Sequence, residues 1–166
     1  MRNLIAVPVI ILGVMLQSAV ISSIKLLSGH ADLPLVMLAA WALQEEVDTA
    51  WQWAMVAGVL VGFFSGIHWL IPVMSYLIVV ALARVFQRRV WQAPLLAMFS
   101  VTFLGTVALY AISFTGLQLS GVPLSVTDVV GLLALPGILL NMLLAIPTYA
   151  VMRDLARWVY PVPEVE

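Results

Sequence analysis

Cysteine is absent from this 166-residue sequence, and charged side chains make up only 9% of it. The lack of cysteine excludes disulfides, thiolate metal sites and a cysteine nucleophile. The net charge of −1 excludes the basic surface that nucleic-acid binding requires. Only two histidines occur, and the motifs of zinc proteases, phosphate-binding loops and serine hydrolases are missing. We therefore expect no catalysis, no cofactor, no metal and no bound nucleic acid.

Apolar side chains, by contrast, are abundant: 64% of the residues are hydrophobic, and the mean hydropathy is +1.13. A soluble domain is roughly half apolar and about a quarter charged. A chain of this length cannot bury so much apolar surface in its own core, so we expect an integral membrane protein. The apolar runs are continuous rather than alternating, which favours an all-α bundle over a β-barrel.

Six apolar runs predict a six-helix transmembrane bundle over residues 1–153, with a cytoplasmic tail at 154–166. A helix needs about 20 residues to cross a hydrocarbon core of about 30 Å. The second and fourth runs are shorter than that, and the second could be a re-entrant segment or a short tilted helix. The first run is longer than the roughly 7–15 apolar residues of a signal peptide, which favours a span. The predicted spans are about 4–24, 33–43, 51–69, 71–83, 91–116 and 129–152.

Lysine and arginine predict the orientation, because both are enriched in cytoplasmic loops. With both termini in the cytoplasm, six arginines lie inside and Lys25 lies outside. A model that omits the second span and starts outside gives the same ratio, so the rule does not decide whether that run crosses. All six tryptophans lie near proposed span ends, as expected at the lipid–water boundary. The arginines that we expect to set the topology at the C-terminal end and in the basic loop are Arg84, Arg88, Arg89, Arg153 and Arg157.

Three glycines, Gly58, Gly62 and Gly66, recur every fourth residue in the third run. This spacing puts them on one stripe of a helix, where small residues let a second helix approach closely. The second helix could be a neighbour in this chain or the transmembrane helix of a partner. Ser18 and Ser22 form a weaker stripe of the same spacing in the first run.

A few polar or helix-breaking residues lie inside the apolar runs. Gln17 needs a hydrogen-bond partner in such surroundings. Pro136 and Pro147 are expected to kink the last helix and to leave carbonyl groups unpaired. Asn141, between the two prolines, could donate to such a carbonyl, donate to another helix, or contact a ligand. Buried ionisable residues, which ion-coupled transporters carry, are nearly absent, and this argues against a pump or channel that acts alone.

Five segments occur in a distinctive order and spacing: LQS at 16–18, ADLPLVMLAAWAL at 31–43, GVLVGFFSG at 58–66, RVFQRR at 84–89 and LPGILLNMLLAIP at 135–147. Through them the chain resembles the bacterial rod shape-determining MreD family along nearly all of its length. One position departs from the family pattern. The family often carries an aspartate three residues before the serine of the Ser-Gly pair, where this sequence has Gly62. Any role of that carboxylate does not carry over.

The resemblance implies a bundle similar to the substrate-binding components of energy-coupling-factor vitamin transporters, but without catalysis. It implies a scaffold in the plasma membrane for the elongation machinery that builds lateral peptidoglycan. The implied direct partner is MreC, through its transmembrane helix. The transpeptidase and glycosyltransferase of elongation and the actin-like filament would be indirect partners. A homo-oligomer is also possible.

An alternative from another class is the small-molecule subunit of a vitamin transporter. It predicts an outward-facing pocket lined by polar and aromatic groups from several spans. The outward candidates in the sequence are His30, Asp32, His68 and Trp69. His30 with Asp32 could also be imagined as metal ligands, although polar side chains at the interface are the expected interpretation. An isolated channel is a third possibility, for which the sequence offers no pore lining.

Overall fold

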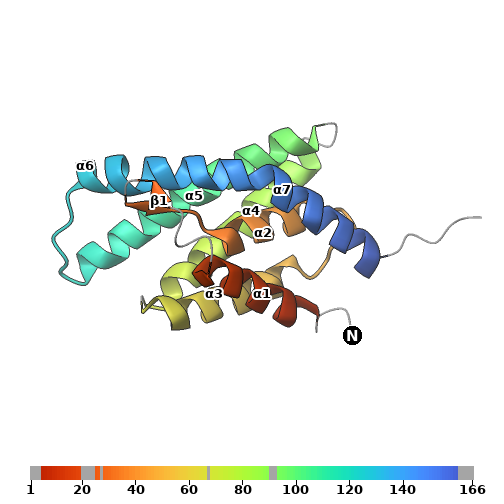
Figure 1. Ribbon diagram of the computed structural model, residues 1–166, viewed down its shortest axis with the longest axis horizontal. Coiled ribbons are helices and arrows are strands. Elements are labelled where there is room, and N and C mark those ends of the chain that lie inside the picture. Colours follow the sequence, from red (N-terminus) through yellow and green to blue (C-terminus); the bar gives the residue numbers. More distant parts are fainter. Residues whose placement is uncertain (1–4, 20–24, 27, 67, 90–92, 161–166) are drawn as a thin grey trace, which may run out of the picture.

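The computed structural model describes residues 5–19, 25–26, 28–66, 68–89 and 93–160, and nearly all of them are helical (Figure 1). The only strands in this described part are β1 (Lys25–Leu26) and β2 (Gly29–His30), which pair as a small antiparallel hairpin. The prediction of an all-α chain is confirmed. The helices are α1 (Ala6–Ala19), α2 (Leu33–Ala42), α3 (Ala50–Ser65), α4 (Leu70–Arg89), α5 (Pro94–Leu119), α6 (Val126–Asp128), the π-helix η3 (Val129–Ala134) and α7 (Leu135–Val159).

Within the described residues, three helical stretches are long and apolar enough to cross a membrane: Leu70–Arg88, Pro94–Leu119 and Val126–Val159. This agrees with the expected association with a membrane, whereas six spans stay a prediction. The helices in the first three predicted spans have 14, 10 and 16 residues, which is short of the about 20 needed to cross alone. Helix-breaking residues explain where two of these helices end. Pro34 lies in the first turn of α2, and Gly66 ends α3.

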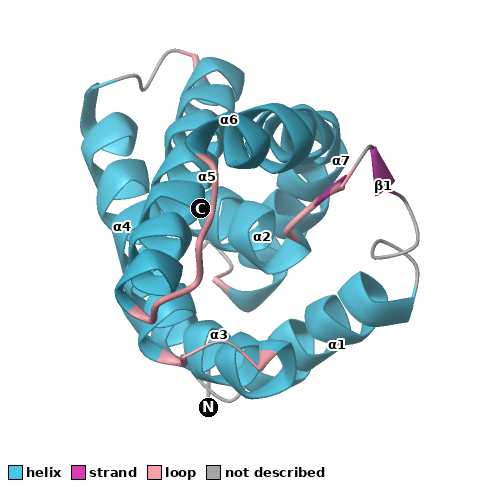
Figure 2. Ribbon diagram, turned by 90° about the vertical axis from the view of Figure 1, so that its left-hand side faces the viewer, coloured by secondary structure: helices cyan, strands magenta, loops and turns pink. Residues whose placement is uncertain are grey.

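Helix α2 is the centre of the bundle, and Figure 2 shows it surrounded by the other helices. It packs against α1, α3, α4, α5 and α7, and nine of its ten residues are buried. Its alanines, Ala39, Ala40 and Ala42, let those neighbours approach closely. At its end, the Trp41 ring stacks on Trp53 of α3 with centroids 4.2 Å apart. A short helix is thereby buried on every side.

The predicted groove at Gly58 and Gly62 exists, but α4 of the same chain fills it. A Cβ atom on Gly58 would lie 2.5 Å from the Cα of Val73, and one on Gly62 would lie 2.7 Å from the Cα of Trp69. These two glycines therefore contact a neighbouring segment of the same chain, and the alternative in which a partner helix packs on them is wrong. Gly66 has a different role: it ends α3 with a φ of 66°, and nothing lies within 4 Å of the position of its missing Cβ.

The hairpin packs against the irregular start of the last long helix. Pro136 lies in the first turn of α7, directly after η3, and it has no N–H to donate to the carbonyl of Leu132. The backbone N–H of Ser28 donates to that carbonyl instead, at 3.2 Å. Gly29 permits this approach, because a Cβ there would lie 2.7 Å from the oxygen of Leu133. Pro147 lies inside α7 on its exposed side.

The arginine-bearing end of the bundle is held by hydrogen bonds between distant segments. Arg84 donates to the carbonyl of Val47 and, at 3.1 Å, to Gln87. The hydroxyl of Tyr160 donates to Asp48 at 3.0 Å, which ties the end of α7 to the loop before α3. Figure 1 shows the start of α1 and the end of α7 at this same end of the molecule.

The remaining arginines that were predicted to set the topology are more exposed. Arg153 of α7 forms an exposed ion pair with Asp154, with Nε and Oδ1 3.5 Å apart. Arg88 and Arg157 have exposed side chains, and the side chain of Arg89 lies outside the described residues. These residues lie at the C-terminal ends of α4 and α7, so they gather at one end of the bundle.

Replacing Gly58 with leucine is expected to lower the free energy of unfolding by about 3 kcal/mol, because the new side chain would meet backbone atoms of α4 that cannot move aside. The measurement is the thermal unfolding midpoint of the purified protein in detergent. Gly131→Leu is the matched control, because nothing lies within 4 Å of a Cβ at that exposed position. Equal midpoints for the two variants would contradict internal packing at Gly58.

Candidate functional site

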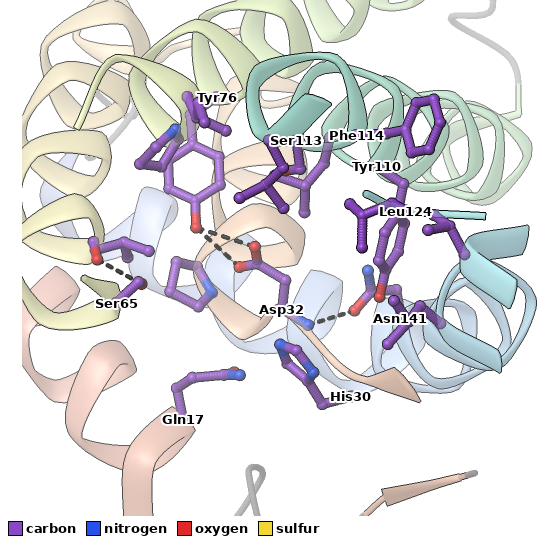
Figure 3. A pocket seen from close by; sticks show the side chains of 18 residues that line it. Gln17, His30, Asp32, Ser65, Tyr76, Tyr110, Ser113, Phe114, Leu124 and Asn141 are labelled. Carbon is purple, nitrogen blue, oxygen red and sulfur yellow. Dashed lines mark hydrogen bonds between the residues drawn. The ribbon is translucent and has the colours of Figure 1, made fainter. Parts of the chain in front are cut away.

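A cavity of about 310 Å³ opens between the helices at the end of the bundle opposite the arginines (Figure 3). Small-molecule sites usually measure about 300–1,000 Å³ and combine apolar walls with a few converging polar groups. This cavity has that character, with side chains from α1 to α5, from η3 and α7, and from the hairpin. Its polar lining residues are Gln17, His30, Asp32, Ser65, Tyr76, Tyr110, Ser113 and Asn141.

Asp32 is the only carboxylate among the described residues of the lining. It caps the N-terminus of α2, where its Oδ1 accepts a hydrogen bond from the N–H of Leu35 at 3.0 Å. The hydroxyl of Tyr76 donates to the same carboxylate, 3.0 Å from Oδ1 and 3.1 Å from Oδ2. Burial raises the pKa of the Asp32 carboxyl above its ordinary value, and the hydrogen bonds from Leu35 and Tyr76 act in the opposite direction. No arginine or lysine faces it among the described lining residues.

Two side chains from distant helices hold the backbone that leads into α2. Asn141 of α7 accepts from the N–H of Asp32 at 2.7 Å and donates to the Thr106 hydroxyl of α5 at 2.9 Å. Gln17 of α1 accepts from the N–H of Leu33 at 2.9 Å and donates to the carbonyl of Ala31. The hydrogen-bond partner expected for Gln17 is thus this backbone, and Asn141 bonds to other elements rather than to a carbonyl that a proline has freed.

Aromatic residues form part of the opposite wall. Tyr76 comes from α4, and Tyr110 and Phe114 come from α5. The hydroxyl of Tyr110 approaches α7 at Gly137, where a Cβ atom would lie only 2.2 Å from that oxygen. A glycine is therefore required at position 137 for Tyr110 to reach across the cavity. Apolar side chains of α5, η3 and the segment before α6 complete the wall, among them Leu117, Leu124 and Leu133.

Only some of the residues predicted to line an outward-facing pocket lie together in the structure. His30 and Asp32 line the cavity, and the side chain of His30 is exposed. His68 and Trp69 do not line it; their rings stack on each other at the exposed start of α4, with centroids 6.1 Å apart. No cluster of three or more metal-ligating His, Asp or Glu residues occurs in the described part of the chain.

Ser18, which was predicted to bind a partner, is not among the described residues that line this cavity. The hydroxyl of Ser18 donates to the carbonyl of Val14 within α1 at 3.0 Å, and the residue is exposed. Ser22 lies outside the described residues. Three residues of the cavity and its network were not predicted from the sequence: Tyr76, Thr106 and Tyr110. Their signal was a hydroxyl group within a long apolar run. A buried hydroxyl of that kind needs a partner as much as an amide does.

A second hollow of about 510 Å³ lies at the arginine-bearing end. The acidic side chains in its lining are Glu45 and Glu46 of the loop after α2, and the basic ones are Arg153 and Arg157 of α7. Charges of both signs face this hollow, so it differs in character from the cavity around Asp32. It suits a polar contact on the aqueous side of the membrane rather than a buried small molecule.

Replacing Asn141 with leucine is expected to cost about 1–3 kcal/mol of folding free energy, because it leaves the buried N–H of Asp32 without its acceptor. Faster hydrogen exchange of the Asp32 amide should accompany a lower thermal midpoint. Leu143→Ala serves as the control on the same helix, because the side chain of Leu143 is 73% exposed. Unchanged amide protection in Asn141→Leu would show that this hydrogen bond does not hold the segment.

Comparison of the chain with protein-family models, with curated proteins and with solved structures finds no match. Membership of the MreD family therefore remains a prediction from the sequence segments. The structure itself shows a helical chain with three helical stretches long and apolar enough to cross a membrane, and a cavity that is part polar and part aromatic.

Proposed function

We propose that this chain is a non-catalytic scaffold in the bacterial plasma membrane that binds the transmembrane helix of MreC and supports lateral peptidoglycan synthesis. One observation carries the proposal. Three of the segments that resemble the MreD family meet at a single place, because Gln17, Asp32 and Asn141 all belong to the network that holds residues 31–33. Segments that resemble one family and converge in space are expected to serve a common purpose.

The positive-inside rule gives the proposed orientation. The arginine-bearing end faces the cytoplasm, and the cavity faces the outside. Both chain ends then lie on the cytoplasmic side, in keeping with the positions of α1 and α7 in Figure 1. The charged hollow lined by Glu46 and Arg153 would face cytoplasmic components of the machinery, such as the actin-like filament.

The partner helix is assigned to the outer face of α1. Gly58 and Gly62 are filled by α4 and are not open to a partner. Helix α1 packs mainly against α2 and α3, and on its other face Leu12 is 58% exposed and Met15 is 62% exposed. With 14 residues, α1 is also too short to cross a bilayer by itself. A long helix packed alongside it would cover this face and shield its ends from lipid.

Co-expression with the MreC protein of the same source should yield a complex that survives purification in mild detergent. A photo-crosslinking amino acid at Leu12 or Met15 should form a covalent adduct with MreC, because both side chains point outward from α1. The same probe at Leu143, exposed on α7, is the matched control and should give no adduct. Absence of a complex would contradict the scaffold role, and adducts from Leu143 alone would move the interface to α7.

The cavity favours a second candidate function, the small-molecule subunit of an energy-coupling-factor vitamin transporter. That alternative predicts an outward-facing pocket with polar and aromatic groups from several helices. The cavity around Asp32 and Tyr110 has this composition and lies at the proposed outer end.

If the second candidate is right, one member of a panel of water-soluble vitamins should raise the thermal midpoint of the purified chain. At a hundredfold excess over its dissociation constant, a ligand of this kind stabilises by about 2.7 kcal/mol. The same vitamin should have no effect on a Gly137→Val variant, in which the added side chain displaces Tyr110. A panel without any stabilising vitamin, together with a stable MreC complex, would leave the scaffold as the function.

A further inference from the structure

The cavity around Asp32 holds a carboxyl group that no arginine or lysine of the described lining faces. Its described lining contains one carboxylate, one imidazole and no lysine or arginine, and the imidazole belongs to the exposed His30. The carboxylate of Asp32 receives hydrogen bonds from neutral donors only, the Leu35 N–H and the Tyr76 hydroxyl. Asp32 is partly buried, and burying a charge is costly unless the charge is paired. The described residues form no salt bridge with Asp32.

We propose that this cavity binds a small organic cation, whose ammonium group pairs with Asp32 and whose apolar body lies against the aromatic wall. The inference does not depend on the scaffold role, since a scaffold and a transporter subunit could both carry such a site. An anion is disfavoured, because it would meet a carboxylate without any opposing arginine or lysine.

The aromatic residues support a cation in particular. Tyr76 and Tyr110 contribute their rings to the lining, with the hydroxyl end of Tyr76 toward the carboxylate, whereas the Phe114 ring lies farther off and points away from Asp32 (Figure 3). The faces of aromatic rings attract cations, and the attraction grows when water is excluded. The hydroxyl of Tyr110 has no hydrogen-bond partner among the described residues and can accept a bond from an ammonium group. Carboxylate and rings together form a recognition site for an alkylammonium or arylalkylammonium ion.

The remaining lining residues and the volume of the cavity determine the polarity and size of the rest of the ligand. Apolar residues, among them Leu109, Leu117 and Val61, slightly outnumber the polar ones in the described lining, so part of the ligand must be apolar. A volume of about 310 Å³ accepts a single ring with a short side chain. A hard metal ion fits poorly, because it needs six or more oxygen ligands and the lining offers one carboxylate. The exposed His30 and Ser65 mark the mouth through which the ligand enters.

Three probes of nearly equal shape test the proposal: benzylammonium, benzyl alcohol and benzoate. Each is titrated against the purified full-length chain in a nonionic detergent, and the thermal midpoint is followed as a function of concentration. Benzylammonium should stabilise the protein saturably, with a dissociation constant about tenfold or more below that of benzyl alcohol. Benzoate should not stabilise it at all. Equal effects of the three probes, or no saturable effect of benzylammonium, would overturn the proposal.

Asp32→Asn separates charge from fold, because asparagine also caps helices and keeps an acceptor for Leu35. It should weaken benzylammonium binding about tenfold while leaving benzyl alcohol binding unchanged. Asp154→Asn is the control, since it removes an equal charge from an exposed position on α7. If Asp32→Asn does not fold, Tyr110→Leu provides the second variant and should also weaken benzylammonium more than benzyl alcohol. Undiminished benzylammonium binding in both variants would refute the site.

The natural cation could be a free molecule or the ammonium of a lipid headgroup. The same titration in nanodiscs distinguishes the two sources. If the headgroup of phosphatidylethanolamine fills the cavity, benzylammonium should bind more weakly in discs that contain it than in discs of phosphatidylglycerol alone. Equal affinities in the two discs identify a free cation. If the unmodified protein forms the MreC complex but does not bind benzylammonium, the cation site is rejected and the scaffold role is not affected.

Discussion

The structure depends on the need to satisfy backbone polar groups where an irregular segment enters an apolar bundle. Residues 31–33 leave the hairpin and begin α2, where Ala31 and Leu33 are buried and their backbone polar groups need partners within the protein. The amides of Gln17 and Asn141, from opposite ends of the chain, provide those partners, and the Asp32 side chain caps the helix that follows. Without them, α2 could not start at this depth, and the helices around it would lose their common centre.

Close packing around that centre depends on glycine and proline residues that destabilise the helix in which they lie. Glycine is a poor helix former, but Gly58 lets the backbone of α4 approach α3 directly. Pro136 removes a hydrogen bond from the last helix, and the N–H of Ser28 in the hairpin uses the carbonyl so released. The hairpin, the π-helix and α7 are thereby joined, and the same junction forms one wall of the cavity, through Leu133 of η3.

Composition and hydropathy were enough to predict a helical membrane chain, and the glycine spacing predicted a closely packed groove. They could not say which helix fills the groove, because α4 and a partner's helix present the same apolar surface to a glycine stripe. Nor could they predict the network around Asp32, because Asn141 is 109 residues away in the sequence. The cavity could not be predicted from the sequence for a related reason. Its tyrosines lie in runs that read as lipid-facing spans, and only the fold shows that they turn inward.

A scaffold and a binding cavity are compatible because they draw on different surfaces of one bundle. The proposed partner face is the outside of α1, where apolar residues such as Leu12 are exposed. The cavity lies on the inner side of the same helix, where Gln17 contributes to its lining. Gln17 also holds the backbone before Asp32, so α1 links the two surfaces through one side chain. A ligand that favours one position of this helix would alter what a partner meets on its outer face, provided that its affinity differs between the two positions.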